Sequence, residues 1–358
     1  MNHAPKFWNK GYSLMSILLI PFSWIYSGLT KLRLYLGAHQ KIDIPVICVG
    51  NINMGGTGKT PVVIDLVMRL LEMGKKPIVV TRGYGGSNKG PIMVTSKHTA
   101  DDVGDEPILL TGFSEVCVSR NRIYGAKMAL SHGADVIILD DGLQNPDLLY
   151  DLTITVMDQK VGFGNSRVFP AGPLREAVTS GLSRTDLIIS IGDKALTSIR
   201  NVPCINGYLK PLETGMDWSG LRSFAFAGIG RPEKFFLTLR TLGAEIVATR
   251  EFGDHQKIPV SILKRLEVEA SLKNSQLVTT EKDAARLPKE WQQKVLTLPV
   301  RLSLNDEKKL NSLLNKFGTH AILGNRKAFV KVDEKFLMND LIFTIPPEFF
   351  IFSISFFN

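Results

Sequence analysis

The sequence predicts an α/β protein with a doubly wound, mostly parallel sheet, a second and smaller α/β domain, and a hydrophobic helix at its N-terminus. Two observations support this fold class. Short apolar runs alternate with helical patterns, as they do in parallel strands that helices cover on both faces. The chain also has 358 residues, and at that length two domains are a more economical interpretation than one core.

The composition excludes several classes of protein and indicates the charge of the expected partner. Hydrophobic residues make up 44% of the chain and charged residues 22%, which excludes disorder as a description of the whole. The 43 basic and 34 acidic residues leave a net charge of +9, which indicates an anionic partner such as a nucleotide, a phospholipid surface or a nucleic acid. Cys48, Cys117 and Cys204 form no CxxC pair, which excludes a disulfide framework and a thiolate zinc cluster.

Residues 1–40 are expected to form a helix that associates with a membrane. The run from Gly11 to Thr30 carries no charge, and Lys10 and Lys31 bracket it. A helix of this length, at about 1.5 Å per residue, would cross a hydrocarbon core. Pro21 interrupts the middle of the run, and a simple span tolerates a central proline poorly.

The arrangement of side chains around this helix favours contact with a membrane surface. At about 100° per residue the polar and apolar residues separate onto opposite arcs. The polar arc holds Ser13, Ser16, Ser23, Ser27 and Thr30, and the apolar arc holds Leu14, Leu18, Ile25 and Leu29. Such a split is typical of a helix that lies in or leans into a bilayer surface. A buried core helix is the alternative, and the sequence leaves open whether the helix spans the membrane.

We expect residues 41–215 to form the larger domain and residues 216–322 the smaller one. In the larger domain, strands are expected at 45–49, 77–81, 135–140 and 186–190, with a helix at 60–73. In the smaller domain, strands are expected at 224–227, 245–248 and 276–279, with helices that open at Pro232 and Pro259. Residues 323–358 form a phenylalanine-rich tail to which we assign no role.

The strongest motif is a glycine-rich loop between the first apolar strand and the first helix of the larger domain. A P-loop needs glycines that let backbone N–H groups turn toward phosphate oxygens, a lysine for the β and γ phosphates, and a hydroxyl for magnesium. The loop supplies them in Asn53, Met54, Gly55, Gly56, Thr57, Gly58, Lys59 and Thr60. Asn53 replaces the usual first glycine, and asparagine tolerates left-handed backbone better than most residues. These eight residues therefore predict a P-loop NTPase-like fold that binds a nucleotide.

Two adjacent carboxylates follow another apolar strand. Asp140 and Asp141 are delivered to the edge of the sheet that carries the P-loop, and successive strand residues point to opposite faces, so the two are expected to have different roles. Asp140 is expected to hold the metal, directly or through water, and Asp141 to help orient the ligand or the loop. We expect Thr60, Asp140, Asp141 and Glu176 to be the residues that hold or support Mg²⁺. Glu176 fits a surface ion pair equally well. ATP is favoured over GTP, because the guanine-reading Asn-Lys-x-Asp pattern is absent from residues 279–283.

Four further stretches carry a resemblance to a known family. They are Thr81-Arg82-Gly83-Tyr84-Gly85-Gly86, Gly104-Asp105-Glu106-Pro107, Pro170-Ala171-Gly172-Pro173-Leu174-Arg175-Glu176 and Phe252-Gly253-Asp254-His255. With Gly50-Asn51 and residues 140–144, their order resembles the tetraacyldisaccharide 4'-kinases, the lipid A 4'-kinases of Gram-negative bacteria. The resemblance covers residues 15–318, approximately. It implies transfer of the γ-phosphate of ATP, with magnesium, to the 4'-hydroxyl of a tetraacylated glucosamine disaccharide 1-phosphate.

The resemblance also implies a catalytic pair, Asp105 and His255, alongside Lys59. A histidine accepts a proton near neutral pH, and a carboxylate fixes its tautomer and stabilises its charged form. The sequence leaves open which of the two takes the proton. Because Asp105 lies in the expected larger domain and His255 in the smaller, their meeting would require closure of the domains over ATP.

The expected partners are a lipid-sugar substrate and the inner-membrane surface, on the cytoplasmic face of the bacterial inner membrane. We expect no nucleic-acid partner, because the sequence shows neither aromatic residues interleaved with basic ones nor a helix suited to reading bases. No protein partner is inferable from the sequence. The alternative function is a membrane-associated P-loop ATPase of the positioning type, which has no small-molecule acceptor. Those ATPases carry an extra lysine before the paired glycines, where this chain has Met54.

Overall fold

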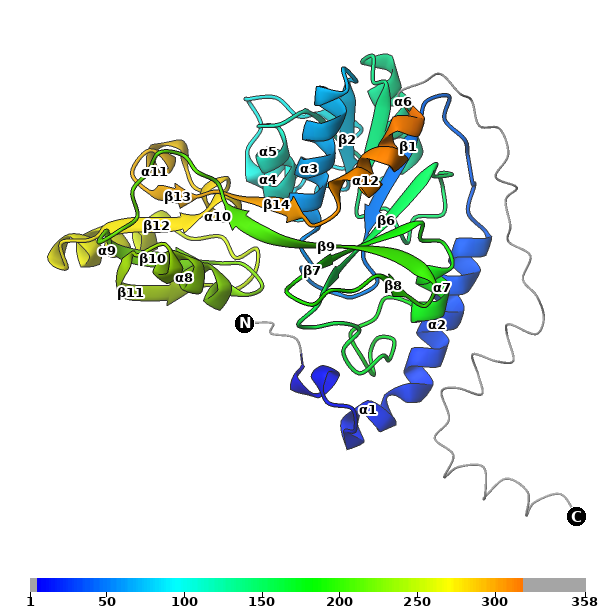
Figure 1. The fold of residues 1–358 in the computed structure, drawn as a ribbon, viewed down its shortest axis with the longest axis horizontal. Helices are drawn as coiled ribbons and strands as arrows, with labels where there is room; N and C mark the ends of the chain where they lie inside the picture. Colours follow the sequence, from blue (N-terminus) through cyan, green and yellow to red (C-terminus); the bar gives the residue numbers. More distant parts are fainter. Residues whose placement is uncertain (1–4, 318–358) are drawn as a thin grey trace, which may run out of the picture. The chain divides into compact units, whose positions relative to one another are not determined.

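The computed structural model describes residues 5–317, and its larger sheet follows the alternating pattern of the sequence (Figure 1). The strand order is β14-β9-β7-β6-β1-β5-β2-β4-β3, with β8 beside β9. The central strands run parallel, whereas β3, β8 and β14 pair antiparallel with their neighbours. The strands are β1 (Val46–Gly50), β2 (Pro77–Thr81), β3 (Ile92–Met93), β4 (Glu115–Val118), β5 (Val136–Asp140), β6 (Leu152–Asp158), β7 (Leu187–Ile191), β8 (Ser198–Ile199), β9 (Val202–Pro211) and β14 (Val300–Leu304).

The register of this sheet sets the position of the functional loops. Every residue of β1 and β5 is buried, as expected for strands covered on both faces. Val49 of β1 lies level with Asp140 of β5. Because both strands end at the same edge of the sheet, the loop that follows β1 emerges beside the two carboxylates at the end of β5.

Helices cover the larger sheet and bury its branched side chains. The apolar face of α3 (Lys59–Glu72) packs Val63, Leu66 and Leu70 into the same core as Ile47 and Ile138 of the central strands. The other helices of this region are α4 (Ala100–Val103), α5 (Asp105–Leu110), α6 (Arg122–Ser131) and α7 (Val178–Leu182).

A second sheet of four parallel strands follows along the chain, in the order β11-β10-β12-β13. Its core contains Phe224, Phe226 and Trp291, which are almost fully buried. The strands are β10 (Arg222–Ala227), β11 (Glu245–Glu251), β12 (Gln276–Thr280) and β13 (Leu296–Leu298). The helices are α8 (Pro232–Thr241), α9 (Val260–Leu272), α10 (Glu281–Ala284) and α11 (Lys289–Gln292).

The chain returns to the larger sheet after β13. Strand β14 pairs antiparallel with β9, and α12 (Glu307–Leu314) buries Leu310 and Leu314 in the core of the larger sheet. The short 3-10 helix η2 (Asn315–Phe317) follows it. The end of the segment expected to form the smaller domain therefore packs with the first sheet, and the domain limits at residues 215 and 322 stay predictions. The phenylalanine-rich tail lies outside the described residues.

The N-terminal apolar run is divided between two helices, where the sequence suggested one. After the 3-10 helix η1 (Lys6–Asn9), α1 (Leu14–Leu18) ends and α2 (Ile20–Tyr35) begins around Leu19. Pro21 lies in the first turn of α2, where its missing N–H costs no hydrogen bond, so the proline starts a new helix. Within residues 5–317, none of the helices has both the length and the apolar character needed to cross a bilayer.

The polar arc of this run faces the protein and the apolar arc faces outward. The Ser16 hydroxyl donates to the Ala171 carbonyl at 2.6 Å, and the Ser23 hydroxyl donates to the Val168 carbonyl at 2.8 Å. Ser16 and Ser23 are buried, whereas Leu14 is 74% exposed. The other members of the apolar arc are also mostly exposed, at 61% for Leu18 and 63% for both Ile25 and Leu29. The alternative of a buried core helix is therefore wrong.

Candidate active site

The glycine-rich loop is held by a second loop that carries Pro173 and Arg175. The Met54 N–H donates to the Pro173 carbonyl at 2.7 Å, and the Arg175 N–H donates to the Ile52 carbonyl at 2.8 Å. The Asn53 side-chain amide donates to the Gly162 carbonyl at 2.8 Å. Asn53 does not have a positive φ, so it does not use the left-handed backbone that asparagine tolerates. Its amide serves instead to anchor the loop.

Glycines give the loop its turn and keep its centre open. Gly55 and Gly58 have φ values of 104° and 90°, in the left-handed region that side chains rarely adopt. A Cβ added at Gly55 or Gly56 would meet no atom within 4 Å. The Thr57 hydroxyl is buried and bonds to no other group of the described chain. An unpaired buried hydroxyl in an open glycine-rich turn fits a phosphate ligand.

Lys59 and Asp141 form an ion pair at the end of the loop. The Lys59 ammonium lies 3.3 Å from Asp141 Oδ1 and 3.2 Å from Asn51 Oδ1. Arg175 Nη1 contacts the same Asp141 oxygen at 2.8 Å. Burial alone would raise the pKa of Asp141, but Lys59 and Arg175 outweigh it and lower this pKa to about 2.

The environment of Asp140 shifts its pKa in the opposite direction from that of Asp141. Its side chain is almost completely buried, and the Thr81 hydroxyl donates to Asp140 Oδ2 at 3.2 Å. Burial, reinforced by the nearby negative charge of Glu106, raises the pKa of Asp140 to about 7 although Lys59 lowers it. The adjacent carboxylates thus have different partners, Thr81 at Asp140 and the cations Lys59 and Arg175 at Asp141.

The side chains near the loop include oxygen ligands of the kind that magnesium uses. Within residues 5–317, no group of three or more histidine, cysteine, aspartate or glutamate side chains is placed to hold a metal ion. Mg²⁺ is usually bound by one or two carboxylates, with waters and phosphate oxygens completing its shell. Two oxygen ligands of this kind lie near the loop. They are the Thr60 hydroxyl, at the start of α3, and the buried carboxylate of Asp140.

Glu176 is fully engaged by neighbours. Its two carboxylate oxygens each lie 2.8 Å from Arg184 Nη2, and Ser180 and Gln144 donate to them at 3.1 Å. Gln144 Oε1 accepts from Arg175 Nη1 at 3.1 Å, and Arg175 in turn pairs with Asp141. Glu176 is therefore linked to Asp141 through the side chains of Gln144 and Arg175.

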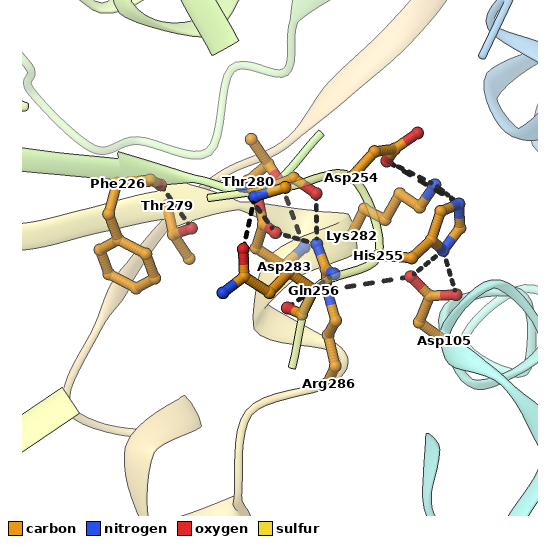
Figure 2. Close-up of polar contacts among 12 residues, drawn as sticks. Asp105, Phe226, Asp254, His255, Gln256, Thr279, Thr280, Lys282, Asp283 and Arg286 are labelled. Atoms are coloured by element: carbon orange, nitrogen blue, oxygen red, sulfur yellow. Dashed lines mark hydrogen bonds and ion pairs between the residues drawn. The ribbon is translucent and has the colours of Figure 1, made fainter. Parts of the chain in front are cut away.

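The structure brings Asp105 and His255 into direct contact (Figure 2). His255 Nδ1 lies 3.1 Å from Asp105 Oδ1 and 3.0 Å from Asp105 Oδ2. Asp105 begins α5 beside the larger sheet, and His255 follows β11 of the second sheet. Burial opposes the charge on Asp105, but the hydrogen bond from His255 and the cations Lys282 and Arg286 lower its pKa overall.

Glu106 links this pair to the glycine-rich loop. Its Oε1 atom lies 3.5 Å from the Thr60 hydroxyl and 3.3 Å from the Lys282 ammonium. Lys282 was not predicted as a site residue, because in the sequence it stands out only within the stretch compared with the guanine-reading pattern. The available signal was its position after β12, because the carboxyl ends of parallel strands carry functional residues.

Comparison with known proteins identifies the family. The family model described as tetraacyldisaccharide-1-P 4'-kinase matches residues 15–318. The chain belongs to the tetraacyldisaccharide 4'-kinase family. It is 50% identical to the tetraacyldisaccharide 4'-kinase of Jannaschia sp. (strain CCS1) over 322 residues, which are 87% of this chain and 98% of that protein. The identity to the tetraacyldisaccharide 4'-kinase of Dinoroseobacter shibae is 47%, over 87% of this chain and 96% of that protein.

A solved structure supports the fold of the tetraacyldisaccharide 4'-kinases for this chain. The crystal structure of LpxK from Aquifex aeolicus in complex with ATP matches with a TM-score of 0.71 and 26% identity, over 86% of this chain and 100% of that chain. The P-loop NTPase-like α/β fold and the activity expected from the motifs, an ATP-dependent kinase of lipid A biosynthesis, are confirmed. The alternative of a positioning ATPase is not favoured.

Proposed function

We propose that this kinase phosphorylates the 4'-hydroxyl of a tetraacylated glucosamine disaccharide 1-phosphate in the site that joins the glycine-rich loop to Asp105 and His255. One observation carries this proposal. The Asp105 carboxylate lies 3.0 Å from His255 Nδ1, while the next residue, Glu106, contacts the Thr60 hydroxyl. A candidate base is thereby held next to the candidate phosphate site.

The nucleotide is held by residues 53–60 in this proposal. Backbone N–H groups of the loop and the N-terminus of α3 face the phosphates, and Lys59 moves from Asp141 toward the β and γ phosphates. Thr60, Asp140 and Asp141 would hold Mg²⁺, which neutralises charge that develops on the phosphates. Glu176 supports Asp141 through Gln144 and Arg175, as residues behind a metal ligand commonly do.

The proton of the acceptor hydroxyl goes to the Asp105–His255 pair. The 4'-oxygen forms a bond to the γ-phosphorus as the bond between that phosphorus and the β–γ bridging oxygen breaks. A positioned base assists this step because a sugar hydroxyl is a poor nucleophile.

The N-terminal helices would dock the enzyme on the cytoplasmic face of the inner membrane, where an acylated substrate resides. The outward apolar residues of α1 and α2 supply the contact, and their buried serines attach the helices to the loop at Val168 and Ala171. The flanking basic residues Lys10 and Lys31 favour anionic headgroups.

The activity is tested with purified full-length protein, radiolabelled ATP, Mg²⁺ and the tetraacylated disaccharide 1-phosphate in mixed micelles. We expect label in the lipid product, and loss of that label when EDTA removes the metal. Folded protein that binds ATP but leaves the lipid unlabelled would contradict the proposed acceptor.

A further inference from the structure

The guanidinium of Arg286 is buried where the second sheet meets Asp105 (Figure 2). The Arg286 side chain is 7% exposed, and its Nε atom lies 3.8 Å from Asp105 Oδ2. We infer that Arg286 is a positioning residue that holds the turn carrying His255 in place against Asp105. This inference rests on the proposed function, because it concerns the same catalytic pair.

The guanidinium joins two turns of the second sheet. Arg286 Nη1 donates to the Gln256 carbonyl at 3.2 Å, and Nη2 donates to the Gly228 carbonyl at 2.7 Å. Gly228 directly follows β10, and Gln256 lies in the turn after the neighbouring strand β11. A guanidinium presents its donors in a fixed planar arrangement, which the ammonium of a lysine does not reproduce. One side chain therefore ties the turn of His255 to the adjacent strand.

Asp283 fixes the orientation of this guanidinium. The Asp283 carboxylate is fully buried and pairs with Arg286 Nη2. It also accepts from the Gly228 N–H at 3.1 Å to each oxygen and from the Thr280 hydroxyl at 2.7 Å. A Cβ added at Gly228 would lie 3.2 Å from Arg286 Nη2 and from the Gly253 carbonyl oxygen. The two turns are thus packed closely around the ion pair.

The backbone of His255 needs such support. Its φ value is 58°, in the left-handed region that histidine adopts only uncommonly. The turn is closed by the Gln256 N–H, which donates to the Gly253 carbonyl at 2.9 Å, and by the Gly253 N–H, which donates to Gln256 Oε1 at 2.7 Å. Arg286 holds the carbonyl of that same Gln256. It therefore fixes the residue beside His255, and with it the direction in which the imidazole points.

Arg286 also acts on Asp105. Its Nε–H is buried and bonds to no group within residues 5–317, although buried donors are normally paired. The positive charge of the guanidinium contributes to the lowered pKa of Asp105. Arg286 thus supports both members of the pair, His255 through the backbone of its turn and Asp105 through charge.

Arg286→Lys tests this role because it keeps a charge beside Asp283 but loses the planar donors. We expect kcat to fall on the order of tenfold, since a displaced acid–base group forfeits part of a contribution of about 10²–10⁴. The KM for ATP should stay within about twofold, because the contacts of Arg286 lie outside residues 53–60. In a His255→Gln background the same substitution should change kcat by less than about twofold, because the imidazole that Arg286 positions is absent.

Arg265→Lys is the matched control. Arg265 lies on α9 of the second sheet, is 73% exposed and pairs with Glu269, so this variant should keep the wild-type kcat. Melting curves show whether each protein is folded. If Arg286→Lys does not fold, Arg286→Gln combined with Asp283→Asn buries no unpaired charge and carries the same expectations.

The position of the imidazole can be measured without turnover. ¹H–¹³C correlation spectra of the histidine rings are recorded on the nucleotide-free full-length protein, and His255→Gln identifies the His255 signal. That signal should shift or broaden in Arg286→Lys and stay unchanged in Arg265→Lys. A folded Arg286→Lys with the wild-type signal and kcat would overturn the inference, as would equal losses of kcat with and without His255. A shifted signal in an enzyme that leaves the lipid unphosphorylated would support the positioning of His255 and refute the proposed function alone.

Discussion

At the scale of single residues, Lys59 is the group whose removal should have the greatest effect on phosphate transfer. Lys59 is the first residue of α3 and directly follows the glycine-rich loop. Its ammonium contacts Asn51 and Asp141. Lys59→Ala should lower kcat at least about a hundredfold, because preorganised charge that stabilises the transferring group is lost. Radiolabel transfer measures this. Lys76→Ala, which removes an exposed ion pair with Glu115, is the control, and equal losses in both variants would contradict the assignment.

Asp140 should make the metal-free protein less stable as the pH rises. Its pKa is raised from 3.8 to about 7 in the folded chain, so between these values the native state binds the proton that the unfolded state releases. The free energy of unfolding therefore falls across this range as pH increases. Thermal unfolding in EDTA from about pH 5 to pH 8 should show a steeper decline in the wild type than in Asp140→Asn. Parallel curves would argue against a buried, protonated Asp140.

The sequence suggests candidate site residues where a local pattern defines the chemistry, and it gives no such signal where only tertiary contacts bring residues together. Residues 53–60 and the two aspartates follow strands in recognisable motifs, and the structure places them at one edge of the sheet. The contact of the Asn53 side chain with the Gly162 carbonyl was not predicted, because the two residues are distant in sequence. Lys282 was missed for the same reason, since nothing near it in the sequence indicates Asp105 or His255.

At the scale of elements, the N-terminal helices should control membrane binding. The exposed apolar arc of α1 and α2 includes Leu18 and Leu29, so Leu18→Glu with Leu29→Glu places two charges where lipid contact is expected. We expect a loss of binding to vesicles of anionic phospholipids in a flotation assay, with an unchanged melting temperature. Leu272→Glu, at an 81% exposed position of α9, should bind vesicles as the wild type does. Equal binding by all three proteins would contradict the docking proposal.

The expected strands and helices are confirmed where the pattern of apolar residues within the segment itself defines them. The predicted strand at 77–81 matches β2, and the predicted helix at 60–73 corresponds to α3. The division of the N-terminal run at Leu19 was not predicted, although Pro21 supplied its physical cause. The return of β14 to the larger sheet has no local signal either, because its pairing with β9 joins residues nearly a hundred positions apart.

At the scale of the whole described chain, one loop connects the proposed membrane contact with the catalytic residues. Ala171 bonds to Ser16 and Ser23, Pro173 accepts from Met54 in the glycine-rich loop, and Arg175 pairs with Asp141. The outward apolar helices and the phosphate site are therefore held by the same short segment. A lipid substrate that enters from the bilayer would reach an active site whose position relative to that bilayer is fixed.

Catalysis should also depend on the contact between the segments that carry the two sheets, because the proposed base is formed from one residue of each. Asp105→Asn and His255→Gln keep side-chain size and should each lower kcat on the order of a hundredfold. Since the two residues act as a unit, the double variant should be no more than a fewfold slower than the slower single variant. Single-turnover rates with saturating ATP measure the chemical step in all four proteins. Losses that multiply in the double variant would mean that Asp105 and His255 act independently, and the pairing across the two sheets would then have no catalytic role.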